Sequence, residues 1–217
     1  MNGKIIAIEG TDGSGKKTQT ELLFNYLKQK GKTILQSFPN YESNSSAPVK
    51  MYLNGEFGEA ANNLDAYSSS LLFAVDRLCT WQKLKKEYKN GTNIVFDRYV
   101  QSNMVHQACK IEDEIEREKF LNWIDNLEFE VIKLPRPNKV FFLNMPPKIS
   151  KALANARKDL KAGTEKDIHE KDEKYLTSAY NAGMNVAKKF GWEIIDCIKD
   201  GKLKTIEEIH KEIVSKL

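Results

Sequence analysis

The sequence has 217 residues, of which 41% are hydrophobic and 29% are charged. A chain of this length and composition can bury a core of its own, which excludes intrinsic disorder and a dependence on disulfides or metal for folding. Its formal net charge is only +4 and no basic run concentrates that excess, so we expect no nucleic-acid partner.

Short apolar runs alternate with longer amphipathic segments along the chain. In chain order the pattern predicts a strand over 5–9, a helix over 16–30, a strand over 33–38, a helix over 64–89, a strand over 93–96, a helix over 112–128, a strand over 140–145, a mostly helical stretch over 148–190, a strand over 193–197 and a helix over 205–217. Thr205 and Glu208 have the spacing of a capping box at the start of the last helix.

Strands that alternate with helices predict an α/β fold, with a five-stranded, mainly parallel sheet flanked by helices. No linker or repeat divides the chain, so we expect a single domain over 1–217. In sheets of this kind ligands bind at the carboxyl ends of the strands. The residues that follow each predicted strand are therefore the first candidates for a functional site.

Cysteine usage and hydropathy indicate the compartment. Cys79, Cys109 and Cys197 are odd in number and form no Cys-x-x-Cys pair, so neither a disulfide framework nor a zinc site is expected. No apolar stretch approaches the roughly 20 residues that cross a bilayer. We expect a cytoplasmic protein with no membrane partner.

A glycine-rich segment joins the first predicted strand to the first predicted helix. It reads Gly10-Thr11-Asp12-Gly13-Ser14-Gly15-Lys16-Lys17-Thr18, close to the phosphate-loop pattern G-x-x-x-x-G-K-[ST]. Glycines let the backbone N–H groups turn toward a phosphate, and the helix N-terminus adds its positive end. Lys16 supplies a point charge for the outer phosphates, so these residues are predicted to bind ATP.

The segment departs from the pattern at one position. The residue after Lys16 is normally Ser or Thr, whose hydroxyl binds Mg²⁺, but here it is Lys17. Either Thr18 takes that role or water does. A phosphate loop indicates a nucleotide and leaves the reaction open.

Four more segments lie at or near places where the fold predicts a ligand. They are Phe38-Pro39-Asn40-Tyr41, Phe73-Ala74-Val75-Asp76-Arg77, Asp97-Arg98-Tyr99 with Ser102-Asn103, and a charged stretch over 157–174. Arg98 follows a buried strand, and its planar guanidinium is suited to hold a phosphate with two hydrogen bonds. Asp97 ends the same strand, as a carboxylate that holds Mg²⁺ does, or caps the next helix.

In this order behind a phosphate loop, these motifs resemble the thymidylate kinase family of nucleoside monophosphate kinases. The resemblance covers nearly the whole chain and includes Leu134-Pro135-x-Pro137. It implies a three-layer P-loop kinase fold with a mobile lid over about 155–174. It also implies a homodimer that uses ATP and Mg²⁺ to convert dTMP to dTDP. Some bacterial members also carry a basic residue at the position of Lys17.

The resemblance implies a catalytic set of cations and one carboxylate. Arg98 would hold the acceptor phosphate, and Asp12 would contact the sugar 3′-hydroxyl or that arginine. Because the loop has Gly13 where some members carry arginine, the lid would supply cations such as Arg157 or Lys166. Asp97 and Thr18 would be the candidate Mg²⁺ ligands.

The same resemblance implies how the nucleoside of dTMP would be held. Phe73 would stack on the thymine, and Arg77 would donate to a pyrimidine carbonyl. Ser102 and Asn103 would complete the contacts to the base edge. The residues that would lie against the sugar and its phosphate are Phe38, Tyr41 and His106.

Three positions keep other functions open. His106 and His169 stand where family members carry Tyr, which leaves room for a kinase of another pyrimidine nucleoside monophosphate. A plain surface histidine is the alternative for His106. Lys17 leaves room for a nucleotide-binding module without catalysis. A guanine-nucleotide switch is not supported, because the chain has no Asn-Lys-x-Asp motif.

Overall fold

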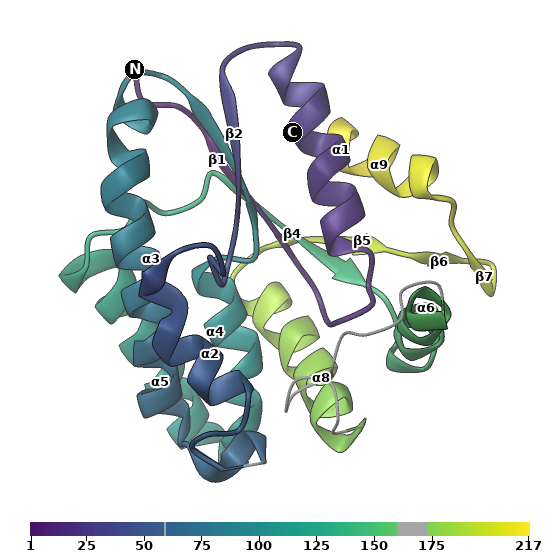
Figure 1. Cartoon of the computed structure of the whole chain (residues 1–217). Helices are drawn as coiled ribbons and strands as arrows, with labels where there is room; N and C mark the ends of the chain where they lie inside the picture. The colour runs from purple at the N-terminus through teal and green to yellow at the C-terminus, as the bar shows by residue number, and fades with distance from the viewer. Residues whose placement is uncertain (59, 160–172) are drawn as a thin grey trace.

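Five parallel strands form the centre of the molecule, in the spatial order β2-β3-β1-β4-β5 (Figure 1). The computed structural model describes residues 1–58, 60–159 and 173–217, without the side chains of 61, 154–159, 173 and 174. The strands are β1 (Ile5–Glu9), β2 (Thr33–Ser37), β3 (Asn93–Asp97), β4 (Lys139–Asn144) and β5 (Glu193–Asp196). The predicted five-stranded parallel sheet is confirmed, with strand boundaries that differ by at most one residue.

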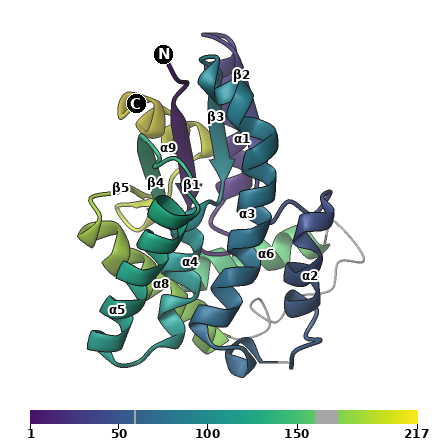
Figure 2. The ribbon, with the colours of Figure 1, turned by 90° about the vertical axis from the view of Figure 1, so that its left-hand side faces the viewer.

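Helices cover both faces of the sheet, because alternate residues of each strand point to opposite sides. Ile6 and Ile8 pack with α1 (Lys16–Lys28) and α9 (Ile206–Ser215) on one face. Ile5 and Ala7 belong to the core on the other face. That face is covered by α3 (Ala66–Lys89), α4 (Val100–His106), α5 (Glu114–Asp125) and α8 (Glu173–Lys189), as Figure 2 shows. The three-layer arrangement is therefore confirmed.

Several elements were not predicted from the hydrophobic pattern. The helices α2 (Ala47–Leu53) and α4 are seven residues each, too short to establish a helical period. The predicted helix over 112–128 ends as an α-helix at Asp125 and continues as a π-helix over Asn126–Val131. The remaining short elements are 3-10 turns at Asn44–Ser46, Ala61–Asn63 and Ala108–Lys110, and an antiparallel pair of β6 (Ile198–Lys199) and β7 (Lys202–Leu203).

The chain after β4 contains the predicted lid. The helix α6 (Pro147–Asp159) begins there, and α8 begins at Glu173. Most of the predicted lid, including Lys166 and His169, lies outside the described residues, as does the side chain of Arg157. Thr205 and Glu208 form the predicted capping box. Among the residues that are described, no helix is long and apolar enough to cross a membrane.

Candidate active site

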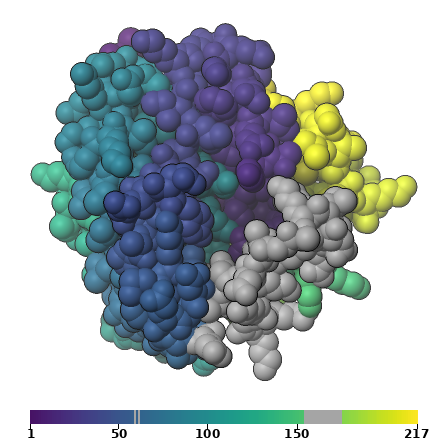
Figure 3. Space-filling model, viewed as in Figure 1, coloured from purple at the N-terminus to yellow at the C-terminus, as the bar shows by residue number. Residues whose placement is uncertain are grey.

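A cavity of about 490 Å³ opens at the carboxyl ends of β1, β2 and β3. In Figure 3 its mouth lies between the purple segment that begins α1 and the dark-blue segment around α2. Its walls include every substrate-binding residue expected from the sequence, namely Phe38, Tyr41, Phe73, Arg77, Arg98, Ser102, Asn103 and His106. Asp12, Gly13, Gly15, Lys16, Lys17 and Asp97 also line it, whereas Gly10, Thr11, Ser14 and Thr18 do not.

The phosphate loop has the backbone that its glycines were expected to allow. Gly13 has φ 79° and Gly15, the N-cap of α1, has φ 88°, in the left-handed region that side chains disfavour. Thr11 Oγ1 and Ser14 Oγ are buried and have no hydrogen-bond partner in the described part of the chain. Unpaired buried hydroxyls are costly, so the loop has the features expected of a site that binds an anion.

Lys16 is buried within this loop and bonds to it. Its Nζ donates to the Thr11 carbonyl at 2.7 Å and lies 3.7 Å from Asp12 Oδ1. Burial, with a smaller contribution from the positive charge of Arg98, lowers the pKa of Lys16 to about 8. Lys17 is exposed at the rim of the cavity, and Thr18 is half-buried outside it.

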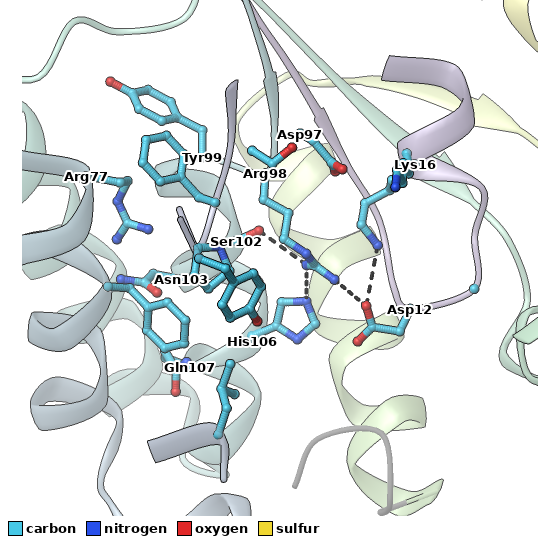
Figure 4. A pocket seen from close by; sticks show the side chains of 18 of the residues that line it. Asp12, Lys16, Arg77, Asp97, Arg98, Tyr99, Ser102, Asn103, His106 and Gln107 are labelled. Atoms are coloured by element: carbon cyan, nitrogen blue, oxygen red, sulfur yellow. Dashed lines mark hydrogen bonds and ion pairs between the residues drawn. The ribbon is translucent and has the colours of Figure 1, made fainter. Parts of the chain in front are cut away.

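Arg98 joins the phosphate loop to the rest of the cavity, as Figure 4 shows. Its Nη2 donates to Asp12 Oδ1 at 2.5 Å, and its Nη1 donates to His106 Nε2 at 2.9 Å and to Ser102 Oγ at 3.4 Å. Asp12 was expected to contact either the sugar 3′-hydroxyl or this arginine, and the bond to Arg98 is the second of these. Arg98 also has φ 67°, a conformation that a residue with a side chain adopts only when its surroundings enforce it.

A buried carboxylate that the sequence analysis missed lies behind Arg98. Glu9, 1% exposed, accepts hydrogen bonds from Tyr99 N and Ser102 Oγ, both at 2.7 Å. Burial raises the pKa of Glu9, while the charge of Arg98 and these two bonds oppose the rise. Although burial alone would lower the pKa of Arg98, Asp12 and Glu9 raise it, so the guanidinium stays charged. The signal for Glu9 was an acidic residue that ends an otherwise apolar strand.

Asp97 ends β3 and faces the cavity as a half-buried side chain. Tyr99 is the N-cap of α4, so the alternative that Asp97 caps this helix is wrong. The described residues contain no group of three or more acidic, histidine or cysteine side chains that could hold a metal ion. One carboxylate beside a phosphate loop fits Mg²⁺, which proteins commonly bind through one or two carboxylates together with substrate phosphates.

The end of the cavity away from the loop is aromatic and polar. The ring of Phe73 makes an edge contact with Tyr52, 6.2 Å between centroids. Phe38 packs against Phe96 and Tyr99 at the side of the cavity. Such a surface can hold a planar ring, since aromatic faces favour stacking.

Arg77 lines this end with a guanidinium held from behind. Glu128, in the π-helix, is fully buried and accepts from Arg77 Nε at 3.1 Å through both carboxylate oxygens, and also from Nη2. None of these bonds uses Nη1, which leaves a donor for a ligand. In the sequence, Glu128 belongs to the predicted amphipathic helix over 112–128, and nothing in that pattern indicates that its side chain is buried.

His106 is a buried wall residue, 6% exposed, so the surface-histidine alternative is wrong. Because Arg98 donates to Nε2, the imidazole proton is on Nδ1. Nδ1 lies 3.3 Å from Tyr175 Oη, which donates to the His106 carbonyl at 3.0 Å. Tyr175 of α8 thus fixes the ring that contacts Arg98.

Asp76, the acidic residue of the Phe73–Arg77 motif, holds the loop after β2. Its carboxylate accepts from Asn40 N at 2.7 Å and from Ser45 Oγ at 2.6 Å. Asp76 is 1% exposed, so this role is structural. It attaches the loop that carries Tyr41 to the helix that carries Phe73.

Comparisons with known proteins agree with this geometry. A family model described as thymidylate kinase matches residues 8–213. The thymidylate kinase of Fervidobacterium nodosum is 30% identical over 214 residues, covering 96% of this chain and 95% of that protein. The thymidylate kinase of Mycobacterium tuberculosis H37Rv is 28% identical over 170 residues, covering 77% and 78%.

The fold has a solved counterpart as well. The structure of thymidylate kinase from Candida albicans superposes with a TM-score of 0.73 at 24% identity, over 99% of this chain and 91% of that one. The family model spans the phosphate loop, Arg98 and the cavity walls contributed by α3 and α4. Since that match extends over most of the sequence, this chain belongs to the thymidylate kinase family of phosphotransferases.

Proposed function

We propose that the protein transfers the γ-phosphoryl group of ATP to the 5′-phosphate of dTMP, giving dTDP and ADP. The observation that carries the proposal is the position of Arg98. It bonds to Asp12 of the phosphate loop and, in the same cavity, to Ser102 and His106 of the wall that leads to Phe73 and Arg77. A phosphate held by Arg98 would lie between a donor at the loop and a base at the aromatic end.

The chemistry of the acceptor explains why cations dominate the site. A monoester phosphate is largely dianionic at neutral pH, since its second pKa is about 6, and it needs no general base. Catalysis then requires charge neutralisation and in-line positioning. We assign Lys16 to the donor phosphates and Arg98 to the acceptor phosphate, and Asp12 orients Arg98. Arg157 and Lys166 remain proposed lid cations.

At the nucleoside end the proposed contacts follow the cavity walls. Phe73 stacks on the thymine, and Arg77 donates through Nη1 to a pyrimidine carbonyl. Phe38 and Tyr41 flank the sugar and phosphate, and Ser102 and Asn103 complete the polar edge. His106, fixed by Tyr175, lies against the sugar.

The test is ADP release from Mg-ATP with dTMP, dUMP, UMP, dCMP and thymidine as separate acceptors. We expect turnover with dTMP and little with the ribonucleotide or with thymidine, which has no phosphate for Arg98. Equal or faster turnover with UMP would instead assign another pyrimidine monophosphate. No turnover with any acceptor, despite ATP binding, would show a nucleotide-binding module and contradict the proposal.

We further propose that Mg²⁺ accompanies ATP, with Asp97 and Thr18 as its protein ligands. When bound, this ion neutralises charge on the phosphates. If Thr18 is a ligand, Thr18→Ala raises the Mg²⁺ concentration needed for half-maximal turnover. Thr20→Ala should not, because the Thr20 hydroxyl donates to the Lys16 carbonyl within α1. An equal effect of the two changes would remove Thr18 from the site.

ATP binding should take up a proton at alkaline pH. The pKa of Lys16 is about 8 in the free protein, and the negative phosphates of ATP raise it toward its ordinary value of 10.5. Between these values Lys16 is neutral in the free protein and charged in the complex, so ATP affinity falls as pH rises above about 8. Calorimetry at pH 9 in buffers of different ionisation enthalpy should show the proton uptake.

The control for this effect is the neighbouring lysine. Lys17→Met leaves the buried amine in place and should keep the proton uptake, while Lys16→Met should abolish it. At pH 7 the amine is charged in both states, so uptake from this residue should be small. Equal uptake at pH 7 and pH 9 would assign the proton to another group.

We propose that the protein is a homodimer assembled through α3. Tyr67, Leu71 and Val75 follow each other at intervals of four and form an exposed apolar stripe on this helix. Leu71→Glu places a charge in its centre and should halve the molar mass measured by light scattering. Ile206→Glu, at an exposed isoleucine of α9, should leave the mass unchanged. A wild-type monomer would contradict the proposal.

A cytoplasmic location is also proposed. It is supported by the three cysteines, which are all free. Cell fractionation would test it, and recovery with secreted proteins would contradict it.

A further inference from the structure

A second cavity, of about 300 Å³, lies behind α4 and shares no lining residue with the first. We refer to it as the rear cavity. The helix α4 separates the two, since Gln101 and Met104 line the rear cavity while Asn103 and His106 line the active-site cavity. The π-helix also contributes to both sides. Phe129 lines the rear cavity, whereas Glu128 bonds to Arg77 at the active-site cavity.

The walls of the rear cavity suit a planar ring. Phe129, Phe190 and Trp192 all contribute to them. The ring planes of Phe190 and Trp192 are inclined to each other by 28°, with centroids 6.4 Å apart. A volume near 300 Å³ is at the lower end of the range of small-molecule sites, which are lined mainly by apolar and aromatic side chains.

One polar side chain of this cavity has no partner. Gln101 is 4% exposed, and its Oε1 is buried without a hydrogen bond from any described residue. A buried amide oxygen without a donor destabilises the folded state. The amide group of glutamine offers an acceptor beside a donor, so its complement is a ligand with an N–H next to a carbonyl.

The charged residues of the rear cavity are already paired. Arg136 donates to both carboxylate oxygens of Asp125 at 2.7 Å, and Lys139 pairs with Glu193 at 2.9 Å. A phosphate or carboxylate would have to break these pairs. The cavity therefore favours an uncharged ligand.

We propose that the rear cavity binds a neutral nucleoside whose base carries an amide edge, an N–H next to a carbonyl. The base lies among Phe129, Phe190 and Trp192, and its amide edge bonds to Gln101. This site goes beyond the proposed phosphotransfer, and nothing in its binding depends on that reaction.

The test monitors Trp192 while the active-site cavity is filled. Trp81→Phe/Trp123→Phe leaves Trp192 as the only tryptophan of the three. An adenosine–thymidine bisubstrate with five bridging phosphates is added first, and its binding is verified by calorimetry. Thymidine, uridine and inosine are then titrated, each beside its ring-N-methyl derivative, which lacks the N–H. Calorimetry on the unmodified chain repeats the measurement independently of the tryptophan changes.

We expect at least one nucleoside to change Trp192 fluorescence saturably, and N-methylation to weaken its binding about ten-fold, as the loss of one buried hydrogen bond does. Gln101→Leu should weaken it by a similar factor. The urea midpoint of this variant should equal or exceed that of the wild type, because the unpaired amide is gone. A lowered midpoint would assign Gln101 a structural role.

Two results would overturn the proposal. One is no saturable signal with any of the three nucleosides at millimolar concentration. The other is binding that N-methylation and Gln101→Leu leave within two-fold. Neither result would bear on phosphotransfer, which the acceptor assay measures separately.

Discussion

Arg98→Lys should lower kcat/KM for dTMP by about 10²- to 10³-fold, toward the lower end of what a phosphate-binding arginine contributes to phosphoryl transfer. The substitution keeps the positive charge that Asp12 and Glu9 require, so the fold should persist. It removes the planar group that bonds to Asp12, Ser102 and His106 at once. Because Arg98 is assigned to the acceptor, the KM for ATP should change much less than the KM for dTMP.

Steady-state kinetics with each substrate varied in turn measure the changes in the KM for ATP and in the KM for dTMP separately. Arg136→Lys is the matched control, since Arg136 also pairs with a carboxylate, that of Asp125, but outside the active-site cavity. Its activity should be close to that of the wild type. If Arg98→Lys retained kcat/KM within a few-fold, Arg98 would not hold the acceptor phosphate.

Glu128→Leu should destabilise the protein by about 3–5 kcal/mol, the cost of leaving a buried charge without its partner. Arg77 is 1% exposed and has Glu128 as its carboxylate partner, so little solvent reaches the side of the guanidinium that loses its bonds. In a domain of this size the loss corresponds to a fall in Tm of roughly 10 °C. Thermal unfolding followed by circular dichroism measures it.

Two further variants test whether the destabilisation by Glu128→Leu comes from the unpaired charge of Arg77 or from the change of side-chain shape. Glu130→Leu, two residues away and exposed, should shift the free energy of unfolding by less than about 0.5 kcal/mol. Arg77→Leu/Glu128→Leu removes both charges and should regain most of the lost stability while binding dTMP poorly. A loss below about 1 kcal/mol for Glu128→Leu would mean that water reaches the Arg77 guanidinium.

The sheet could be predicted because strands leave local patterns in the sequence, whereas the nucleoside-contacting residues of the cavity walls came from the family resemblance. Apolar runs marked the five strands, and the motifs after the first three strands of the chain contributed to the cavity, as expected for parallel strands. The helices α2 and α4 were missed because seven residues give fewer than two full helical periods. Their positions are set by tertiary contacts, such as the bond from Asn103 to the Ser70 carbonyl.

The partners of the predicted residues could not be predicted, because pairing depends on distances across the fold. Glu128 is 51 residues from Arg77, and Glu9 is 93 residues from Ser102. In the sequence Glu128 is one of many charged residues on an amphipathic segment. It lies in the π-helix, an element that an amphipathic α-helical pattern does not predict, and its side chain is fully buried there.

The left-handed backbone at Arg98 sets a limit on how this enzyme can be improved. A side chain in that region costs of order 1 kcal/mol, and glycine would relieve it. Arg98→Gly would also leave Asp12 without its bond to the guanidinium and the buried Glu9 without a nearby positive charge, which costs more than the strain that glycine relieves. Laboratory evolution of a thermostable form must therefore find its gains at other positions, because at this one only the backbone conformation favours glycine, whereas charge pairing and catalysis both favour arginine.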